Sequence, residues 1–129
     1  MRADVCGVNV VHADKVARAV SSLIPEETVG RLAETFKVLS DPTRLKIISV
    51  LLEDELCVCD ISAVVKLSQS AISHQLGALR RERLVKRRRD GQKIFYSLDD
   101  EHIKHLLSEG LDHVSEPDDL VRRADIFAG

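Results

Sequence analysis

The segment that most constrains the fold of this chain runs from residue 68 to residue 96 and reads SQSAISHQLGALRRERLVKRRRDGQKIFY. Within it, Ile72, Leu76 and Leu79 recur at spacings of four and three, which predicts one apolar stripe of an α-helix with a polar face opposite. A basic run, an Asp-Gly turn at positions 90–91 and an alternating segment then predict a β-hairpin, because Asp-Gly supplies the positive φ angles of a two-residue turn. A helix followed directly by a basic hairpin is typical of a winged helix-turn-helix. The sequence therefore predicts a mainly α fold with a small β-hairpin wing.

The charge of the chain is segregated along the sequence. The net charge is −2, yet residues 80–93 hold eight basic and two acidic side chains, so this segment carries +6 and the remainder −8. Such segregation concentrates positive potential where a phosphate backbone would lie. A solvated basic loop is the alternative, but the position directly after a candidate recognition helix favours DNA binding. The residues expected at the DNA are Ser68, Gln69, Ser70, Ser73, His74, Gln75, Arg80, Arg81, Arg87, Arg88, Arg89 and Lys93.

The rest of the chain predicts further helices before and after this segment. Apolar periodicity, proline positions and candidate caps at Asp41 and Ser68 predict helices over residues 13–23, 25–40, 42–52, about 61–65 and 98–115. We expect a flexible arm over 1–12 that carries metal ligands, a DNA-binding and dimerisation domain over 13–116, and a mobile tail over 117–129. A length of 129 residues is typical of a protomer that completes its core by dimerising.

The composition of the chain indicates its cellular compartment. Apolar residues make up 44% and charged residues 31%, no run approaches the ~20 apolar residues of a membrane span, and the N-terminus lacks the order of a signal peptide. We therefore expect a cytoplasmic protein with no membrane partner. Three cysteines cannot all pair within one chain, and a reducing compartment keeps thiols free, so metal or redox chemistry is favoured over disulfides.

Two segments carry candidate metal ligands, the first being Cys57-Val58-Cys59. It lies at or just before a helix N-terminus, where backbone N–H groups favour the thiolate that metals bind. The alternative is a pair of small buried apolar residues. Because Zn²⁺ binds about four ligands, further groups would be needed. Cys6 and His12, on the N-terminal arm, could supply them, also from a partner subunit.

The second candidate site lies on the last predicted helix, where Asp100, His102, His113 and Glu116 form Asp-x-His and His-x-x-Glu. The two histidines share a face to within ~20°, but they stand ~16 Å apart along the axis, so one chain cannot bring both to one ion. Two such helices packed antiparallel can, and this gives two symmetric His₂-carboxylate₂ sites suited to Zn²⁺ or Co²⁺. The alternative is an ordinary polar helix face.

Together these motifs resemble the ArsR/SmtB family of metal-responsive repressors. The resemblance covers residues 29–116 and rests on ELCVCD at 55–60, SAISHQL at 70–76, and the Asp-x-His and His-x-x-Glu pairs. It implies a homodimeric winged-helix protein that binds operator DNA and releases it when Zn(II), Cd(II) or Pb(II) binds, so that efflux or sequestration genes are expressed. It also implies that Cys57 and Cys59, with Cys6, match a thiolate site, and that Asp100, His102, His113 and Glu116 match a zinc site between C-terminal helices.

The chain departs from this family's pattern at two places. Members that sense cadmium or lead bring a second arm cysteine about four residues after the first, where this chain has Val10; His12 is close enough to substitute and would give a Cys₃His set. Pro117 directly follows Glu116, and a residue before proline is pushed out of helical geometry.

Three other functions are alternatives to a metal-responsive repressor. Cys57 and Cys59 could sense redox state or arsenicals on the same scaffold. The chain could be an architectural DNA-binding protein without an effector. A zinc hydrolase would also use His and carboxylate ligands, but the sequence lacks a His-Glu-x-x-His helix and a glycine-rich phosphate loop, so we expect no enzyme.

Overall fold

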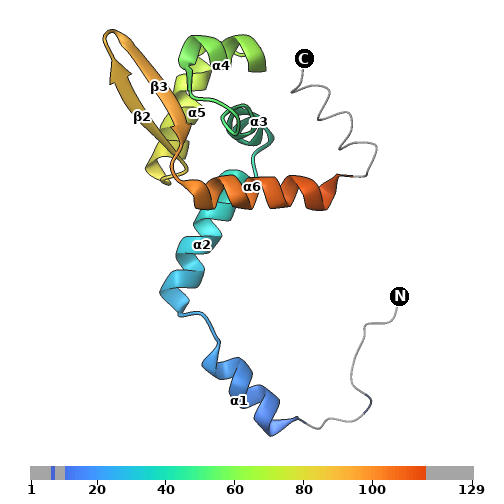
Figure 1. The fold of residues 1–129 in the computed structure, drawn as a ribbon. Coiled ribbons are helices and arrows are strands. Elements are labelled where there is room, and N and C mark those ends of the chain that lie inside the picture. The colour runs from blue at the N-terminus through green and yellow to red at the C-terminus, as the bar shows by residue number, and fades with distance from the viewer. Residues whose placement is uncertain (1–6, 8–10, 116–129) are drawn as a thin grey trace. The chain divides into compact units, whose positions relative to one another are not determined.

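A computed structural model describes residue 7 and residues 11–115 of the chain (Figure 1). The expectations for Cys6, Val10, Glu116, Pro117 and the tail over 117–129 fall outside these residues. The chain divides into two compact units, residues 1–33 and residues 34–129, and the boundary lies inside one helix.

The first unit contains helix α1 (Ala13–Ser21) and the first part of helix α2 (Glu26–Leu39). α1 ends two residues earlier than expected, and the side chains of Ser21 and Ser22 donate hydrogen bonds to the carbonyl of Arg18 at its C-terminal end. Such side-chain bonds compete with the helical pattern of the backbone. α1 has no buried residue.

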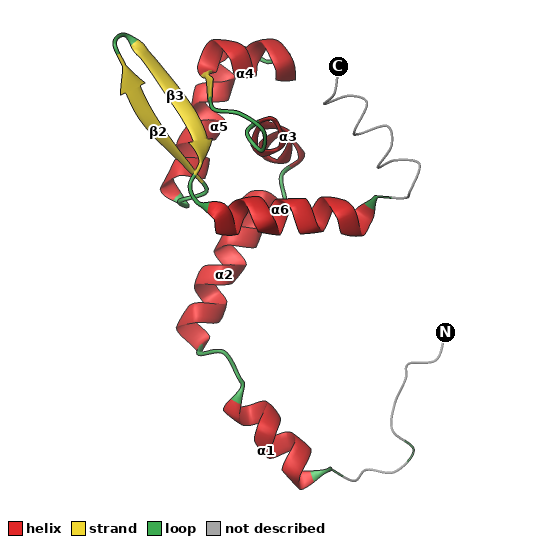
Figure 2. Cartoon of the chain, viewed as in Figure 1, coloured by secondary structure: helices red, strands yellow, loops and turns green. Residues whose placement is uncertain are grey.

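The second unit is the predicted winged helix-turn-helix, and Figure 2 shows its helices and hairpin. Helices α3 (Pro42–Val50), α4 (Val58–Val65) and α5 (Gln69–Arg81) precede strands β2 (Val85–Asp90) and β3 (Lys93–Leu98), and helix α6 (Glu101–Val114) follows. A short strand β1 (Leu56–Cys57) pairs with β3, so the sheet is antiparallel with the order β1-β3-β2. The sequence did not predict β1, because two residues are too few to show an alternating pattern.

The core of the second unit lies where α3, α4 and α5 meet the base of the sheet. The stripe predicted on the recognition helix is confirmed, since Ile72, Leu76 and Leu79 have no exposed surface. Between α4 and α5, Lys66 takes a left-handed conformation with φ of 64°, which ends α4 and turns the chain toward α5. The buried residues of this core are Leu39, Ile47, Ile48, Leu51, Ile61, Ile72, Leu76, Leu79, Leu84, Val85, Tyr96 and Leu98.

The predicted boundaries of the hairpin loop and of the last helix were wrong by one and three residues. Asp90 is paired with Lys93 inside the hairpin, so the two-residue loop is Gly91 and Gln92 rather than Asp90 and Gly91. Gly91 supplies the positive φ, 65°, at the first position of this loop. The last helix begins at Glu101 and not at Leu98, because Leu98 is still paired in β3 and the side chain of Asp100 caps the helix by accepting from the N–H of Ile103.

Candidate DNA-binding surface and metal ligands

Helix α5 presents a polar face to solvent. Ser68 is its N-cap, as predicted, and the Ser68 hydroxyl accepts a hydrogen bond of 3.1 Å from the N–H of Ala71. Outside the buried stripe, nearly every residue expected at the DNA is exposed: Ser68, Gln69, Ser70, Ser73, His74, Arg80 and Arg81. α5 can therefore be held by the core while its outer residues remain available to a duplex.

Gln75 is the exception on this helix. It is half-buried, and its side-chain oxygen accepts a hydrogen bond of 2.8 Å from Nε of Arg44 on α3. Arg44 is itself held at the start of α3, where its backbone N–H donates to the carboxylate of Asp41. Sequence reasoning missed Arg44, because no local pattern indicates that α3 brings a guanidinium beside α5. The pair adds a cation next to the candidate recognition surface.

The register of the hairpin separates its basic residues onto two faces. Directly paired residues of an antiparallel sheet share a face and neighbours along a strand alternate. Arg87 is paired with the buried Tyr96, and Arg89 is paired with Ile94, so both arginines lie on the face that leads into the core. Arg88 and Lys93 lie on the opposite face, where Arg88 is paired with Phe95. All four side chains belong to exposed residues.

Arg88 is bound within the protein. Its Nη2 atom lies 2.6 Å and its Nε atom 2.9 Å from Oε1 of Glu55, and its guanidinium lies 4.9 Å from the centre of the Phe95 ring. The hydrogen bond to Glu55 raises the pKa of Arg88 above its ordinary value. Among the described residues, Arg87 and Arg89 make no ion pair.

The two predicted thiols lie at the junction of β1 and α4. Cys57 ends β1 and is the N-cap of α4, and Cys59 follows in the first helical turn. The Cys57 thiol donates a hydrogen bond of 3.1 Å to Oδ2 of Asp60, while Cys59 is exposed. Sequence reasoning missed Asp60 as a partner, although its place three residues after the N-cap is the spacing at which a side chain reaches back to a cap.

A hollow of about 340 Å³ lies beside these thiols, lined by Cys57, Cys59 and Asp60 and, from the hairpin, by Gln92, Lys93 and Ile94. Two sulfurs and a carboxylate are donors suited to Zn²⁺ and softer ions. Within the part of the chain that the structure describes, no three candidate ligands converge on one point. His12, the remaining described candidate, is the N-cap of α1 in the first unit.

At the C-terminal helix, the structure brings together the first predicted pair, Asp100 and His102, while Glu116 of the second pair lies outside the described residues. Nδ1 of His102 lies 3.4 Å from Oδ2 of Asp100, whereas His113 lies in the last turn of α6; both histidines are exposed. The pKa of Asp100 is lowered, mainly by the hydrogen bond from the N–H of Ile103 and to a smaller extent by the contact with His102. This carboxylate is therefore ionised at neutral pH.

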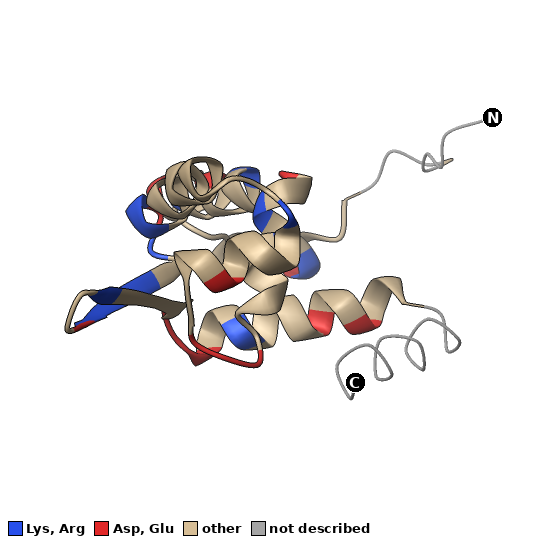
Figure 3. Cartoon of the chain, turned by 90° about the horizontal axis from the view of Figure 1, so that it is seen from above, with Lys and Arg blue, Asp and Glu red and all other residues tan. Residues whose placement is uncertain are grey.

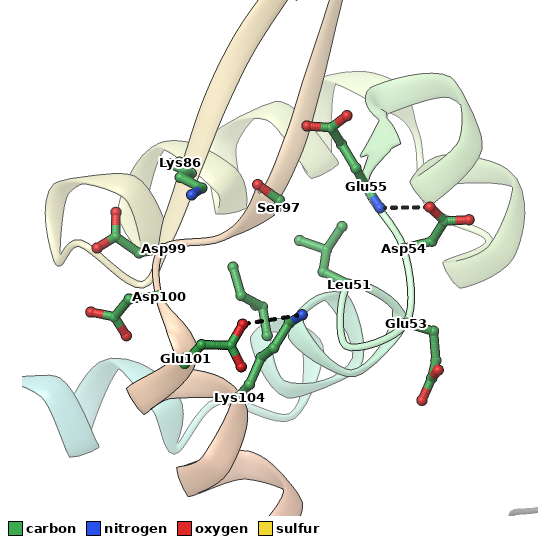
Figure 4. Close-up of a pocket in the computed structure, with 11 residues that line it drawn as sticks. Leu51, Glu53, Asp54, Glu55, Lys86, Ser97, Asp99, Asp100, Glu101 and Lys104 are labelled. Atoms are coloured by element: carbon green, nitrogen blue, oxygen red, sulfur yellow. Dashed lines mark hydrogen bonds and ion pairs between the residues drawn. The ribbon is translucent and has the colours of Figure 1, made fainter.

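An acidic hollow of about 540 Å³ lies near Asp100 (Figure 4). Lys86 and Lys104 are the basic residues among its lining, which also includes the acidic side chains Glu53, Asp54, Glu55, Asp99, Asp100 and Glu101. Figure 3 shows basic residues gathered on the hairpin and acidic residues where β3 leads into α6. The charge segregation read from the sequence is therefore also a segregation in space, with positive charge on the hairpin. Among the described residues, no helix is long and apolar enough to cross a membrane.

Comparison with known proteins identifies the family. The family described as "Bacterial regulatory protein, arsR family" matches residues 41–87. The "Transcriptional repressor SmtB homolog" of Synechocystis sp. is 43% identical over 113 residues, which cover 88% of this chain and 86% of the relative. The "Cadmium resistance transcriptional regulatory protein CadC homolog" of Staphylococcus aureus is 43% identical over 117 residues, which cover 90% of this chain and 96% of the relative.

Solved structures agree with this assignment. HlyU from Vibrio cholerae N16961 superposes with a TM-score of 0.67 at 32% identity, over 71% of this chain and all of that chain. The homodimeric winged helix-turn-helix DNA-binding domain of Mb0332 from Mycobacterium bovis has a TM-score of 0.64 at 22% identity, over 80% of this chain and 88% of that chain, and supports the fold. The chain thus belongs to the ArsR/SmtB family of DNA-binding transcriptional regulators, which are not enzymes.

Proposed function

We propose that this regulator is a metal-responsive repressor. As an apo homodimer it binds operator DNA, and it dissociates when Zn(II), Cd(II) or Pb(II) binds, so that metal efflux or sequestration genes are expressed. The observation that carries this proposal is the position of Cys57 and Cys59, two free thiols at the junction between α4 and a strand of the wing's own sheet. The similarity to a cadmium resistance regulatory protein and to an SmtB homolog supports it.

In the proposed thiolate site, Cys57 and Cys59 are the primary ligands. Asp60 lies close enough to orient the Cys57 sulfur. Cys6 and His12 of the arm would complete the set, from the same chain or from the partner subunit, and a Cys₃His set accommodates Zn²⁺ as well as softer ions. A bound ion would neutralise thiolate charge and join the segments that hold its ligands. By joining them it would favour one arrangement of the three-stranded sheet to which Cys57 belongs.

A second site would form between two copies of α6. The contact between Asp100 and His102 pre-orients the N-terminal pair of one helix. His113 and Glu116 of an antiparallel partner helix would supply the remaining ligands, which gives two symmetric sites per dimer. Exposed apolar side chains on α6, Leu106 and Val114, favour such pairing, because these residues lose water when a second helix covers them.

In the apo dimer, two α5 helices would enter successive major grooves of an inverted repeat. Ser70, Ser73 and His74 would face base edges or phosphates, and Arg87 and Arg89 of the hairpin would lie along the flanking backbone. Whatever free energy metal binding removes from DNA binding, DNA binding removes from metal binding, typically ~1 to 3 kcal/mol for such couplings.

A second candidate function is a thiol-based redox or arsenical sensor. It is favoured by the exposure of Cys59 and by its place in the first turn of α4, since an accessible thiol at a helix N-terminus is favoured as the reactive thiolate. On this mechanism α6 would contribute no effector site.

Fluorescence anisotropy on a duplex from upstream of the gene for this chain tests the proposal. Zn²⁺, Cd²⁺ and Pb²⁺ are titrated into complexes of the wild type, the Cys57→Ser/Cys59→Ser variant and the His102→Ala/His113→Ala variant. We expect metal to release the wild-type protein and one double variant to lose this response, which identifies the regulatory site. If metals leave every complex intact while an oxidant or arsenite releases the wild type, the thiol sensor is the correct function.

A further inference from the structure

We propose that Glu55 and Arg88 form a connection between the thiol strand and the wing, so that Arg88 is a positioning residue for the effector response and not a phosphate contact. The effector part of this inference rests on the proposed function. The assignment of Arg88 on DNA does not, and it can be tested without any metal.

The first observation is the way Glu55 holds the guanidinium. Nε of Arg88 lies 2.9 Å from both carboxylate oxygens of Glu55, and Nη2 lies 2.6 Å from Oε1. A carboxylate that accepts from two guanidinium nitrogens fixes orientation as well as distance. The ring of Phe95 covers the guanidinium from another direction, at 4.9 Å. Several contacts must therefore break before Arg88 can reach a phosphate.

The second observation is the charge around Arg88. Besides Glu55, Asp90 lies 3.9 Å from Nη1. Two carboxylates beside one guanidinium cancel the positive potential that would attract a phosphate. Arg89, the next residue on the strand, makes no ion pair within the described residues and lies on the other face of the hairpin. The charge of Arg89 is therefore available to a DNA phosphate. The charge of Arg88 is balanced by the carboxylates of Glu55 and Asp90.

The third observation is the register of the three strands. Cys57 of β1 is paired with Phe95 of β3, and Phe95 is paired with Arg88 of β2. These residues therefore form one row across the sheet, on one face. Glu55 directly precedes β1, two residues before Cys57. Its side chain reaches across β3, the central strand, to Arg88 on β2. A movement of β1 caused by a ligand at Cys57 is carried to the far strand of the wing by the side chain of Glu55 as well as by the backbone.

Both side chains are partly exposed, 54% for Arg88 and 31% for Glu55. Exposed ion pairs contribute little to the stability of a fold, so we expect variants of this pair to fold normally. The contribution of the pair lies in fixing the orientation of the wing relative to β1. Measurements of DNA affinity and of the metal response are sensitive to this orientation, whereas thermal unfolding is not.

The first experiment is a salt series without metal, in EDTA, on a duplex from upstream of the gene for this chain. Each phosphate contact contributes about 0.9 to the slope of log affinity against log salt. We expect Arg89→Ala, the matched control on the same strand, to reduce the slope by about one per subunit, and Arg88→Ala to leave it unchanged. An equal reduction by Arg88→Ala overturns the assignment, because the guanidinium would then contact a phosphate.

The second experiment measures the ratio of dissociation constants for this duplex with and without Cd²⁺ or Zn²⁺. Arg88→Ala and Glu55→Ala should each reduce the ratio at least threefold, and the double variant should reduce it no further, because both changes remove one connection. Glu53→Ala, on the same loop, and Arg89→Ala should keep the wild-type ratio. Wild-type ratios in both Arg88→Ala and Glu55→Ala would overturn the connection.

The two experiments separate two failures. If the wild-type complex responds to none of the metals, the proposed function fails and the metal role of the pair fails with it. The salt series still decides whether Arg88 contacts DNA.

Discussion

At the scale of single residues, the start of the recognition helix depends on one hydroxyl. Ser68 accepts the hydrogen bond of the Ala71 N–H, which has no partner inside the helix. We predict that Ser68→Ala lowers the free energy of unfolding by about 1 kcal/mol, because this donor then loses its partner. Thermal or urea unfolding monitored by circular dichroism measures the change.

Ser70 provides the matched control, since it is also exposed and lies in the first turn of α5. Within the described residues its side chain makes no hydrogen bond, so Ser70→Ala should change stability by less than about 0.5 kcal/mol. Equal destabilisation by both variants would contradict the role of Ser68 as a cap.

At the scale of elements, the hairpin depends on the backbone conformation of Gly91. Its φ of 65° lies in the left-handed region, and a Cβ built there meets no atom within 4 Å. We predict that Gly91→Ala destabilises the second unit by about 1 kcal/mol through backbone conformation alone, because left-handed geometry is unfavourable for a residue with a Cβ. Chemical denaturation checks this value.

Gln92→Ala is the control for this prediction, because Gln92 shares the two-residue loop but has no positive φ. We expect it to leave stability within about 0.5 kcal/mol of the wild type. If Gly91→Ala were equally neutral, the loop would adopt another turn than the one described.

At the scale of the whole molecule, the proposed dimer depends on α6. Leu106 is 38% exposed, and it lies four residues after His102 and seven before His113, on the same helical face. We predict that Leu106→Glu weakens dimerisation about tenfold or more, because burying a leucine is worth roughly 1.5 to 3 kcal/mol. Sedimentation equilibrium measures the dissociation constant of the dimer.

Ser108 is an exposed α6 residue outside this face, and Ser108→Glu introduces the same charge. It should leave the dimer intact. A protein that sediments as a monomer before any substitution would contradict the pairing of α6.

The winged helix-turn-helix could be predicted from the sequence, because its main signals are local. The spacing of Ile72, Leu76 and Leu79, the cap at Ser68 and the loop glycine all act within a few residues of chain. The family resemblance rests on equally local motifs, and the comparisons confirm it.

The contacts between elements distant in sequence could not be predicted in this way and are seen only in the folded chain. Arg44 meets Gln75 across 31 residues and Arg88 meets Glu55 across 33. From the sequence, Arg87, Arg88 and Arg89 form one basic run. The strand register divides them between two faces and pairs the middle arginine with a carboxylate. The physical reason is that periodicity fixes which residues share a face, whereas the packing of helices and strands fixes what that face meets.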